Sequence, residues 1–386
     1  MRLLMFGVAV LCGAVGSRAG VLDDSVYQAA VQRGIQAVYN LEFESAEEEF
    51  SMLITLQPKH PSGYFFRAMI TWWRIMIDLD NRQYDERFFR DLEEVVSMCD
   101  SMLERNPDDV DAFFFKGGAI GFEGRLRFHR DDWLAAANAG RKALPLVQQA
   151  SELDPHNYDI LLGTGIYNYY AEVIPNEYPF VKPLLLFIPS GDKKKGIEQL
   201  RLAASRARYA SIETSYFLLQ IYYSYERDYP KALEIARSLH ARFPGNMVFH
   251  KYVGRCYVLL GDWTVAEGIF REIAGRAQAG ARGYTRTVER EAVYYLGLCA
   301  MNARRYDSAL EEWYRCDALC RELDTREPSG FMVMANLKMG MIYDVQGKRA
   351  LAIAQYRKVR TMKEFKDSLS QAEQYLETPY AEVTTP

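Results

Sequence analysis

Hydrophobic and small residues recur along the chain at helical spacing, in paired segments joined by short polar turns. In KYVGRCYVLLGDWTVAEGIF, residues 251–270, apolar positions three and four apart predict two amphipathic helices that meet at Gly261. Gly254 in the first helix is followed by Ala266 and Phe270 in the second, at +12 and +16. Small residues let two antiparallel helices approach closely, and a ring one turn further fills the space where they diverge. The stretch therefore predicts a helical hairpin.

The same spacing of small residue, small residue and ring recurs elsewhere. Gly34, Gly297 and Gly340 are each followed by Ala at +12 and by an aromatic residue at +16. From Gln220 the small residue recurs at +12, but Ala236 replaces the ring at +16. One hairpin leaves an apolar face uncovered, so repeated copies must stack to bury it. Several copies close with proline, which stops a helix, as in LQPKHP, RNPDD, LDPHN and RFPGN.

These residues resemble the tetratricopeptide repeat, whose hairpins carry a small residue in the first helix, a small residue and a ring in the second, and a closing proline. The resemblance covers about residues 24–363 and implies an all-α, right-handed solenoid of about eight hairpins. We call the small residue of each first helix its marker. The markers are Gly34, Ala68, Gly117, Gly165, Gln220, Gly254, Gly297 and Gly340, and the units at 68, 117 and 165 carry long insertions. An ordinary helical bundle is the alternative.

The first twenty residues, MRLLMFGVAVLCGAVGSRAG, have the pattern of a secretory signal peptide. One arginine precedes an apolar run from Leu3 to Val15, and Ser17-Arg18-Ala19 offers a small-x-small cleavage site. The alternative is a membrane anchor, but thirteen apolar residues are too few to span a bilayer comfortably. The sequence thus predicts an exported protein with a signal over 1–19. The short charged start favours the bacterial periplasm.

The remainder is expected to form three parts: N-terminal units with long insertions over 20–210, a C-terminal array over 211–363, and a capping helix with a tail over 364–386, its helix near 366–377. One insertion, 171–191, contains four prolines and the apolar residues Phe180 and Leu184 to Ile188, so it cannot be one helix. It either covers the ends of neighbouring helices or contacts a partner or a membrane surface.

Composition argues against several classes of function. Hydrophobic residues make up 49% of the 386 residues, ample for a continuous core, and the net charge of −4 gives no reason to expect nucleic acid. The five histidines show no metal-ligand spacing, and no phosphate loop or nucleophile motif occurs. We therefore expect no metal, no cofactor and no catalytic residue.

Cys316 and Cys320 lie one helical turn apart, a spacing that fits either a pair of metal ligands or two buried thiols. Export to an oxidising compartment would also permit a disulfide bridge between Cys299 and Cys316.

The resemblance implies that residues at −3, +1, +4 and +5 from each marker line the concave face of the superhelix. In the last four units, eleven of these sixteen positions are hydrophobic. We refer to the predicted contacts as the partner-binding set: Phe217, Ile221, Tyr225, Lys251, Arg255, Leu259, Tyr294, Leu298, Met301, Leu337 and Met341. The stripe fits either an open groove for an apolar helix or extended peptide, or a core filled by the chain itself.

Lys251 and Arg255 also resemble part of the carboxylate clamp by which some members of this family hold a peptide C-terminus. The asparagine that a clamp takes from preceding repeats is absent, so an intramolecular ion pair is the alternative. We expect a non-catalytic scaffold that binds another protein or a peptide in the cell envelope. The second hypothesis is a periplasmic protein that binds a small ligand or glycan through aromatic residues such as Trp72 and Trp73.

Overall fold

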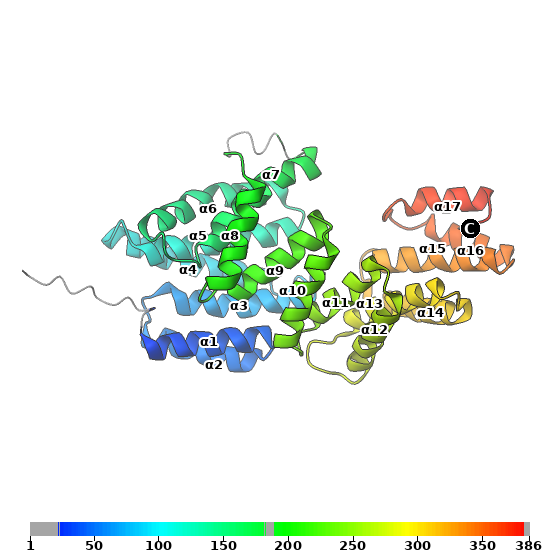
Figure 1. Ribbon diagram of the computed structural model, residues 1–386, viewed down its shortest axis with the longest axis horizontal. Helices are drawn as coiled ribbons and strands as arrows, with labels where there is room; N and C mark the ends of the chain where they lie inside the picture. Colours follow the sequence, from blue (N-terminus) through cyan, green and yellow to red (C-terminus); the bar gives the residue numbers. More distant parts are fainter. Residues whose placement is uncertain (1–21, 23, 181, 183–188, 382–386) are drawn as a thin grey trace, which may run out of the picture.

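Helices account for every regular element in the computed structural model, which describes residues 22, 24–180, 182 and 189–381. Within these residues α1 to α16 pair in chain order as eight hairpins, and α17 follows (Figure 1). The pairs are α1 (Ser25–Tyr39) with α2 (Phe43–Leu56), α3 (Pro61–Ile77) with α4 (Asp85–Arg105), α5 (Val110–His129) with α6 (Trp133–Leu153), α7 (Leu161–Glu177) with α8 (Lys193–Arg206), α9 (Ser211–Gln220) and the π-helical η3 (Ile221–Tyr225) with α10 (Tyr229–Arg242), α11 (Met247–Leu260) with α12 (Trp263–Gln278), α13 (Arg286–Asn302) with α14 (Tyr306–Leu323), and α15 (Gly330–Val345) with α16 (Arg349–Val359). The predicted C-terminal helix is α17 (Ser368–Glu377).

The all-α solenoid of tetratricopeptide-like hairpins is thus confirmed. The predicted signal peptide, residues 1–19, lies outside the described residues. Aspartate sets the start of several helices, because its carboxylate accepts a hydrogen bond from the backbone N–H of the third helical residue. This cap occurs at Asp24, Asp109, Asp132, Asp192, Asp228 and Asp262.

The marker glycines lie where paired helices touch. A Cβ atom at these positions would lie 2.2 to 2.8 Å from the ring sixteen residues later, for Gly34 on Phe50, Gly254 on Phe270, Gly297 on Trp313 and Gly340 on Tyr356. Real Cβ atoms do not approach so closely, so only glycine permits this packing. The spacing that suggested the repeat therefore has the predicted physical cause. In two units with insertions the glycine meets an aliphatic side chain instead, Val147 at Gly117 and Leu200 at Gly165.

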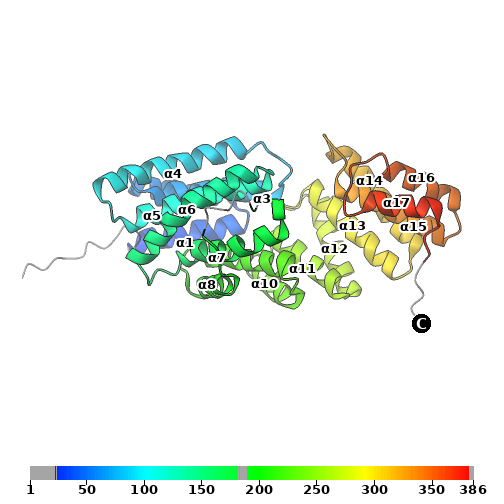
Figure 2. The ribbon, with the colours of Figure 1, turned by 90° about the horizontal axis from the view of Figure 1, so that it is seen from above.

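The first two hairpins pack directly against the fifth and sixth. Figures 1 and 2 show α1 and α3 beside α9, α10 and α11. The ring of Tyr39 lies 5.5 Å from that of Phe243, and the indole of Trp73 lies 5.7 Å from Phe249. The Asn246 side chain donates a hydrogen bond to the Tyr39 carbonyl at 2.9 Å. The superhelix therefore closes on itself over its first six units, and aromatic side chains fill its interior.

Buried apolar residues form two clusters that meet in α13. Val288, Ala292 and Leu296 belong to the first cluster, which begins at Tyr27. Val293 and Ala300 belong to the second, which continues to Ala372. Figure 2 shows α14 to α17 as a smaller block beside the body that contains α1 to α11. One helix thus joins the closed body to the C-terminal block.

We predict that Gly297→Ala destabilises the protein by about 1–3 kcal/mol, because the added Cβ would lie 2.3 Å from Trp313 Nε1. The control is Gly268→Ala in α12, where an added Cβ meets no atom within 4 Å. That change should stabilise by about 0.5–1 kcal/mol, as alanine favours a helix. Urea unfolding followed by circular dichroism measures both. Equal shifts in the two variants would contradict close packing at the marker.

Candidate functional site

The partner-binding set lies on α9, η3, α11, α13 and α15, the first helices of the last four hairpins. Its side chains differ in exposure. Four are buried: Phe217, Ile221, Leu337 and Met341. Six are half-buried: Tyr225, Lys251, Arg255, Tyr294, Leu298 and Met301. Leu259 is 44% exposed. The four buried side chains have almost no area to offer a partner, and a binding role for the set stays a prediction.

Arg125 of α5 explains why Phe217 is covered. Its guanidinium donates to Glu213 Oε1 at 2.6 Å and to Gln220 Oε1 at 3.0 Å, and its Cζ lies 3.9 Å from the Phe217 ring centroid. Tyr39 of α1 donates its hydroxyl to the other oxygen of Glu213 at 2.7 Å. This buried ion pair therefore joins three distant hairpins. Sequence reasoning missed Arg125 because its partners lie 88 and 95 residues away.

The two tryptophans proposed to stack on sugars lie in the filled interior. Trp72 is 0% exposed and Trp73 is 1% exposed. Trp72 packs on Phe122 and Phe88, while Trp73 packs on Tyr39 and Tyr216. Neither indole can present a face to a glycan, so the glycan hypothesis loses the observation that motivated it.

Lys251 and Arg255 form an intramolecular ion pair with Glu291 of the next unit. Lys251 Nζ lies 3.1 Å from Glu291 Oε2, and Arg255 Nη2 lies 2.5 Å from Glu291 Oε1. Burial opposes ionisation of Glu291, but the attraction of Arg255 and Lys251 outweighs it and lowers the pKa of this carboxyl. The alternative to a carboxylate clamp is thus confirmed. Asp78 at the end of α3 also attracts Lys251, so the two cations face two carboxylates.

A second ion pair secures the junction between the closed body and the C-terminal block. Arg290 Nη1 lies 2.7 Å from Asp324 Oδ1, and Arg290 Nη2 lies 3.8 Å from Asp80 Oδ2 in the α3–α4 loop. The guanidinium also lies 5.2 Å from the Phe331 ring centroid. Tyr294 of the partner-binding set packs on the same Phe331 ring at 5.4 Å. Charge and aromatic packing therefore fix the inner side of α13 against α15.

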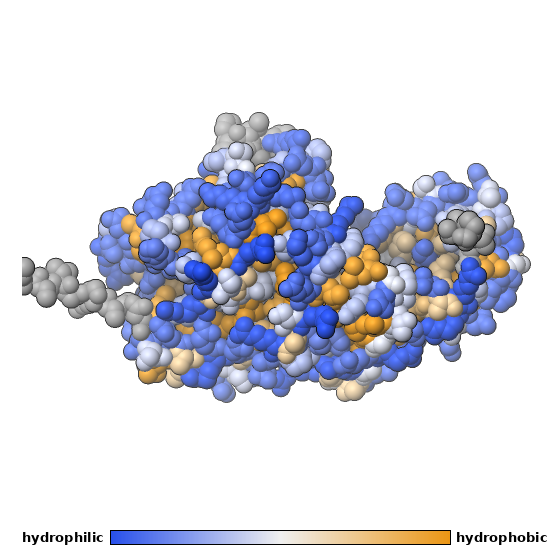
Figure 3. Space-filling view, in the orientation of Figure 1, coloured by the Kyte–Doolittle hydropathy of each residue, from blue (hydrophilic) through white to orange (hydrophobic). Residues whose placement is uncertain are grey.

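Exposed apolar side chains gather at the turn between α11 and α12. Leu259 is 44% exposed, Leu260 42% and Val265 39%. Figure 3 shows hydrophobic atoms at the surface over α11, α12 and α13. Leu298 and Met301, both half-buried, lie on α13, the first helix of the following unit. The open part of the predicted stripe is therefore concentrated at units six and seven.

The insertion at 171–191 begins later than its prolines suggested, because α7 continues through Pro175 to Glu177. Beyond it, Tyr178 and Phe180 pack on Trp133 with ring centroids 5.1 and 5.3 Å apart. At the other end the Tyr167 hydroxyl donates to the Pro189 carbonyl. These ends cover neighbouring helices, as one alternative held. Phe180 nevertheless stays 62% exposed, and Leu134, which follows Trp133 in the sequence, is 66% exposed. Leu184 to Ile188 lie outside the described residues.

Burial suppresses the reactivity of the described cysteines and of one histidine. The five described cysteines are free and buried, so the Cys299–Cys316 bridge is not formed. Burial raises the pKa of Cys256 and Cys299 to about 12, which makes their thiolates scarce at neutral pH. Burial also lowers the pKa of His129 to about 4. No group of three metal-ligating side chains converges in the described part of the chain. Over the same residues, no helix combines the length and apolar character needed to cross a bilayer.

The hairpin geometry defines a helical-repeat fold that is tetratricopeptide-like. No protein-family model matches the chain, and a search of curated proteins found no match. Several solved structures are similar in fold. One is the human IFIT1 dimer with m7Gppp-AAAA, with 14% identity, a TM-score of 0.44, and coverage of 92% of this chain and 85% of that chain.

Two further structures are similar to a comparable degree. The Rap protein complexed with competence and sporulation factor has 13% identity, a TM-score of 0.45, and coverage of 92% and 97% of the two chains. The APC/C hetero-tetramer Cut9-Hcn1 has 15% identity, a TM-score of 0.46, and coverage of 92% and 64%. At these identities and scores the similarity transfers no ligand or partner to this chain.

We predict that Glu291→Gln destabilises the protein by about 3–5 kcal/mol at pH 7, because Lys251 and Arg255 stay buried without their counter-charge. The control is Glu322→Gln, which removes an ion pair with Arg286 whose side chains are both 52% exposed, and should cost less than about 1 kcal/mol.

The same variant gives a pH test. The folded-state pKa of Glu291 lies below its ordinary value of 4.5, so its stabilisation is present above pH 4.5 and is lost as the pH falls below it. The difference in unfolding free energy between the native chain and Glu291→Gln should therefore stay constant from neutrality to pH 4.5 and shrink as the pH falls further. Urea titrations over this range measure it. A difference in unfolding free energy that is independent of pH would show that the ion pair of Glu291 does not cause the difference in stability.

Proposed function

We propose that this protein is a non-catalytic scaffold, exported to the bacterial cell envelope, that binds a segment of another protein. The contact surface is the open part of the partner-binding set at units six and seven. The observation that carries the proposal is the exposure of Leu259, Leu260 and Val265 at the turn between α11 and α12, together with the half-buried Leu298 and Met301 on the first helix of the next unit. Large apolar side chains grouped on a surface are typical of interaction sites, and leucine and methionine adapt to varied apolar partners.

The surroundings of this surface suit an apolar segment. Lys251 and Arg255 have Glu291 as their counter-charge within the chain, and Asp78 also attracts Lys251, so these cations are already matched. An amphipathic helix or extended peptide could place apolar side chains on α11 and α13. A peripheral membrane contact through 171–191 stays a prediction, supported by the exposure of Phe180 and Leu134.

Binding is tested with a display library of random peptides selected against the full chain. We expect the selected peptides to carry apolar or aromatic anchors and to lose about tenfold or more in affinity for Leu259→Asp. The control is Leu351→Asp, on the second helix of unit eight, where the side chain is 49% exposed. Equal affinity for Leu259→Asp and the native chain would refute the proposed surface.

Export is tested by producing the full chain in a bacterium and fractionating the cells. The signal pattern predicts periplasmic protein that begins at Gly20, after cleavage at Ser17-Arg18-Ala19. Mass spectrometry of the mature N-terminus measures this directly. An intact N-terminus in the soluble cytoplasmic fraction would contradict export.

A further inference from the structure

Two histidines stack on each other at the ends of the turn between α10 and α11. His240 lies in the last turn of α10 and His250 in the first turn of α11. Their ring centroids are 4.2 Å apart, and the ring planes make an angle of 13°. His250 is buried, and a hydrogen bond of 2.9 Å joins its Nδ1 to the Tyr284 hydroxyl. Within the described part of the chain, the buried Nδ1 of His240 has no hydrogen-bond partner. The pair is a cluster of titratable groups outside the proposed binding surface.

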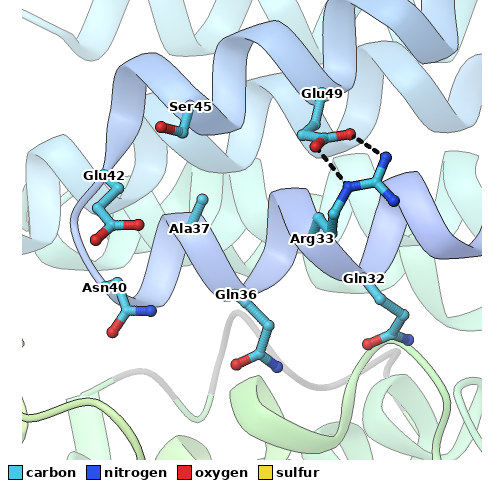
Figure 4. A pocket seen from close by; sticks show the side chains of 8 residues that line it. All are labelled: Gln32, Arg33, Gln36, Ala37, Asn40, Glu42, Ser45 and Glu49. Atoms are coloured by element: carbon cyan, nitrogen blue, oxygen red, sulfur yellow. Dashed lines mark hydrogen bonds and ion pairs between the residues drawn. The ribbon is translucent and has the colours of Figure 1, made fainter.

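Between the two histidines lies the α10–α11 turn, on which the first hairpin packs. The ring of Phe243 lies 5.5 Å from that of Tyr39, and Asn246 donates a hydrogen bond to the Tyr39 carbonyl. An added Cβ at Gly245 would lie 3.7 Å from the carbonyl oxygen of Asn40. Figure 4 shows Asn40 on the turn that joins α1 to α2, at one end of the hollow between these helices. The histidine stack therefore fixes both ends of a segment that closes the superhelix.

The loop between α12 and α13 covers the histidine pair and also contacts the first hairpin. Tyr284 of this loop is buried, and its ring packs edge-on against the ring of His250 at 6.1 Å. The preceding Gly283 lies against the α1–α2 turn, since an added Cβ there would be 2.4 Å from Leu41 Cδ1. Leu41 is itself buried by this contact. Separation of the first hairpin would therefore uncover the loop that seals His250 from water.

The charged groups around the pair come from α12. Arg276 donates to the Tyr284 hydroxyl at 3.1 Å and to the Pro244 carbonyl at 2.9 Å, and its positive charge acts on both rings. Glu272 Oε2 lies 3.9 Å from His250 Nε2, but the other oxygen of Glu272 pairs with Arg276 at 2.7 Å. Glu272 is also exposed, so water screens its charge. A proton on either ring thus gains little from the one nearby carboxylate and faces a guanidinium.

These surroundings keep both rings neutral while they are covered. Burial, the neighbouring histidine and Arg276 lower the pKa of His250 to about 3. Burial and Arg276 lower the pKa of His240 below its ordinary value of 6.5, and Glu272 offsets this only in part. A histidine in water keeps its ordinary pKa and takes up a proton as the pH falls below 6.5. The closed arrangement, with the first hairpin packed on the α10–α11 turn, is therefore fully stabilised above pH 6.5 and loses stability between pH 6.5 and about 3.

We propose that the stacked pair His240 and His250 is an acid-sensitive switch that releases the first hairpin from the α10–α11 turn. A proton taken from solvent by either ring places a positive charge beside Arg276 and the second imidazole, so the stack separates. The turn and the α12–α13 loop then lose the arrangement that holds α1 and α2, and the aromatic interior around Tyr39 and Trp73 meets water. This switch goes beyond the scaffold proposal and does not depend on it.

Hydrogen exchange of backbone amides, followed by mass spectrometry on the full chain, measures this opening at pH 7 and pH 5. Rates are corrected for the intrinsic effect of pH. Through His250 alone, the population of the opened form should rise about 25-fold between these pH values. We expect faster exchange in α1, in α2 and in residues 243–246, with α15 and α16 unchanged because they belong to the other buried cluster. Acceleration spread evenly over the chain, or none in α1, would overturn the proposal.

Variants separate this pair from other acid-sensitive groups. His240→Phe keeps an aromatic ring in the stack and removes one titrating group, so α1 should respond less to acid. His250→Phe should remove the 25-fold rise, and circular dichroism at pH 7 checks that each variant is folded. The controls are His129→Phe in α5, also a histidine with its pKa lowered by burial, and His156→Phe, at an exposed position. Both controls should keep the native response.

The comparison remains decisive if His250→Phe does not fold, because His240 makes no hydrogen bond through its buried Nδ1 and is the milder replacement. In that case the native chain and His240→Phe are compared alone. An acid response of α1 that is the same in His240→Phe as in the native chain, or one that is lost in His129→Phe, would refute the switch.

Discussion

The close approach of two antiparallel helices at each marker residue governs the architecture. Where the marker is glycine, the ring sixteen residues later lies against the backbone itself, as Trp313 does at Gly297. That contact fixes the separation and angle of the pair and so the shape of the face offered to the next pair. The small rotations between neighbouring units repeat along the chain and accumulate into a superhelix. The inner face is a product of these local contacts.

Closure of the superhelix decides which part of that face is free. Once Tyr39 and Trp73 pack on Phe243 and Phe249, aromatic side chains fill the interior of the first six units. The buried Arg125 then needs Glu213 beside it, since an unpaired charge at this depth would be costly. Surface that a partner can contact remains only outside this filled interior. The turn between α11 and α12 is such a place, and its apolar side chains stay exposed.

Local features of the fold could be predicted from the sequence. The spacing from Gly254 to Phe270 lies within one hairpin, and a contact between them follows from helix geometry alone. The ion pair of Lys251 and Arg255 was an expected alternative, but its partner Glu291 belongs to the next unit and could not be named. Closure of the superhelix could not be predicted from the sequence. Asn246 contacts Tyr39 across 207 residues, and their proximity depends on every rotation between the units that separate them. The burial of Leu337 and the exposure of Leu259 could not be told apart either, because each depends on how neighbouring units pack.

The division of buried residues in α13 has a consequence for partly unfolded molecules. If the C-terminal block opened first, Val293 and Ala300 would face water on a helix still held by the other cluster through Val288 and Leu296. The newly bared stripe would be rigid and already helical, so a second molecule in the same condition could dock there at little entropic cost. Self-association under mild heat or denaturant would then start at α13, and protecting this helix would be the most direct way to keep the protein in solution.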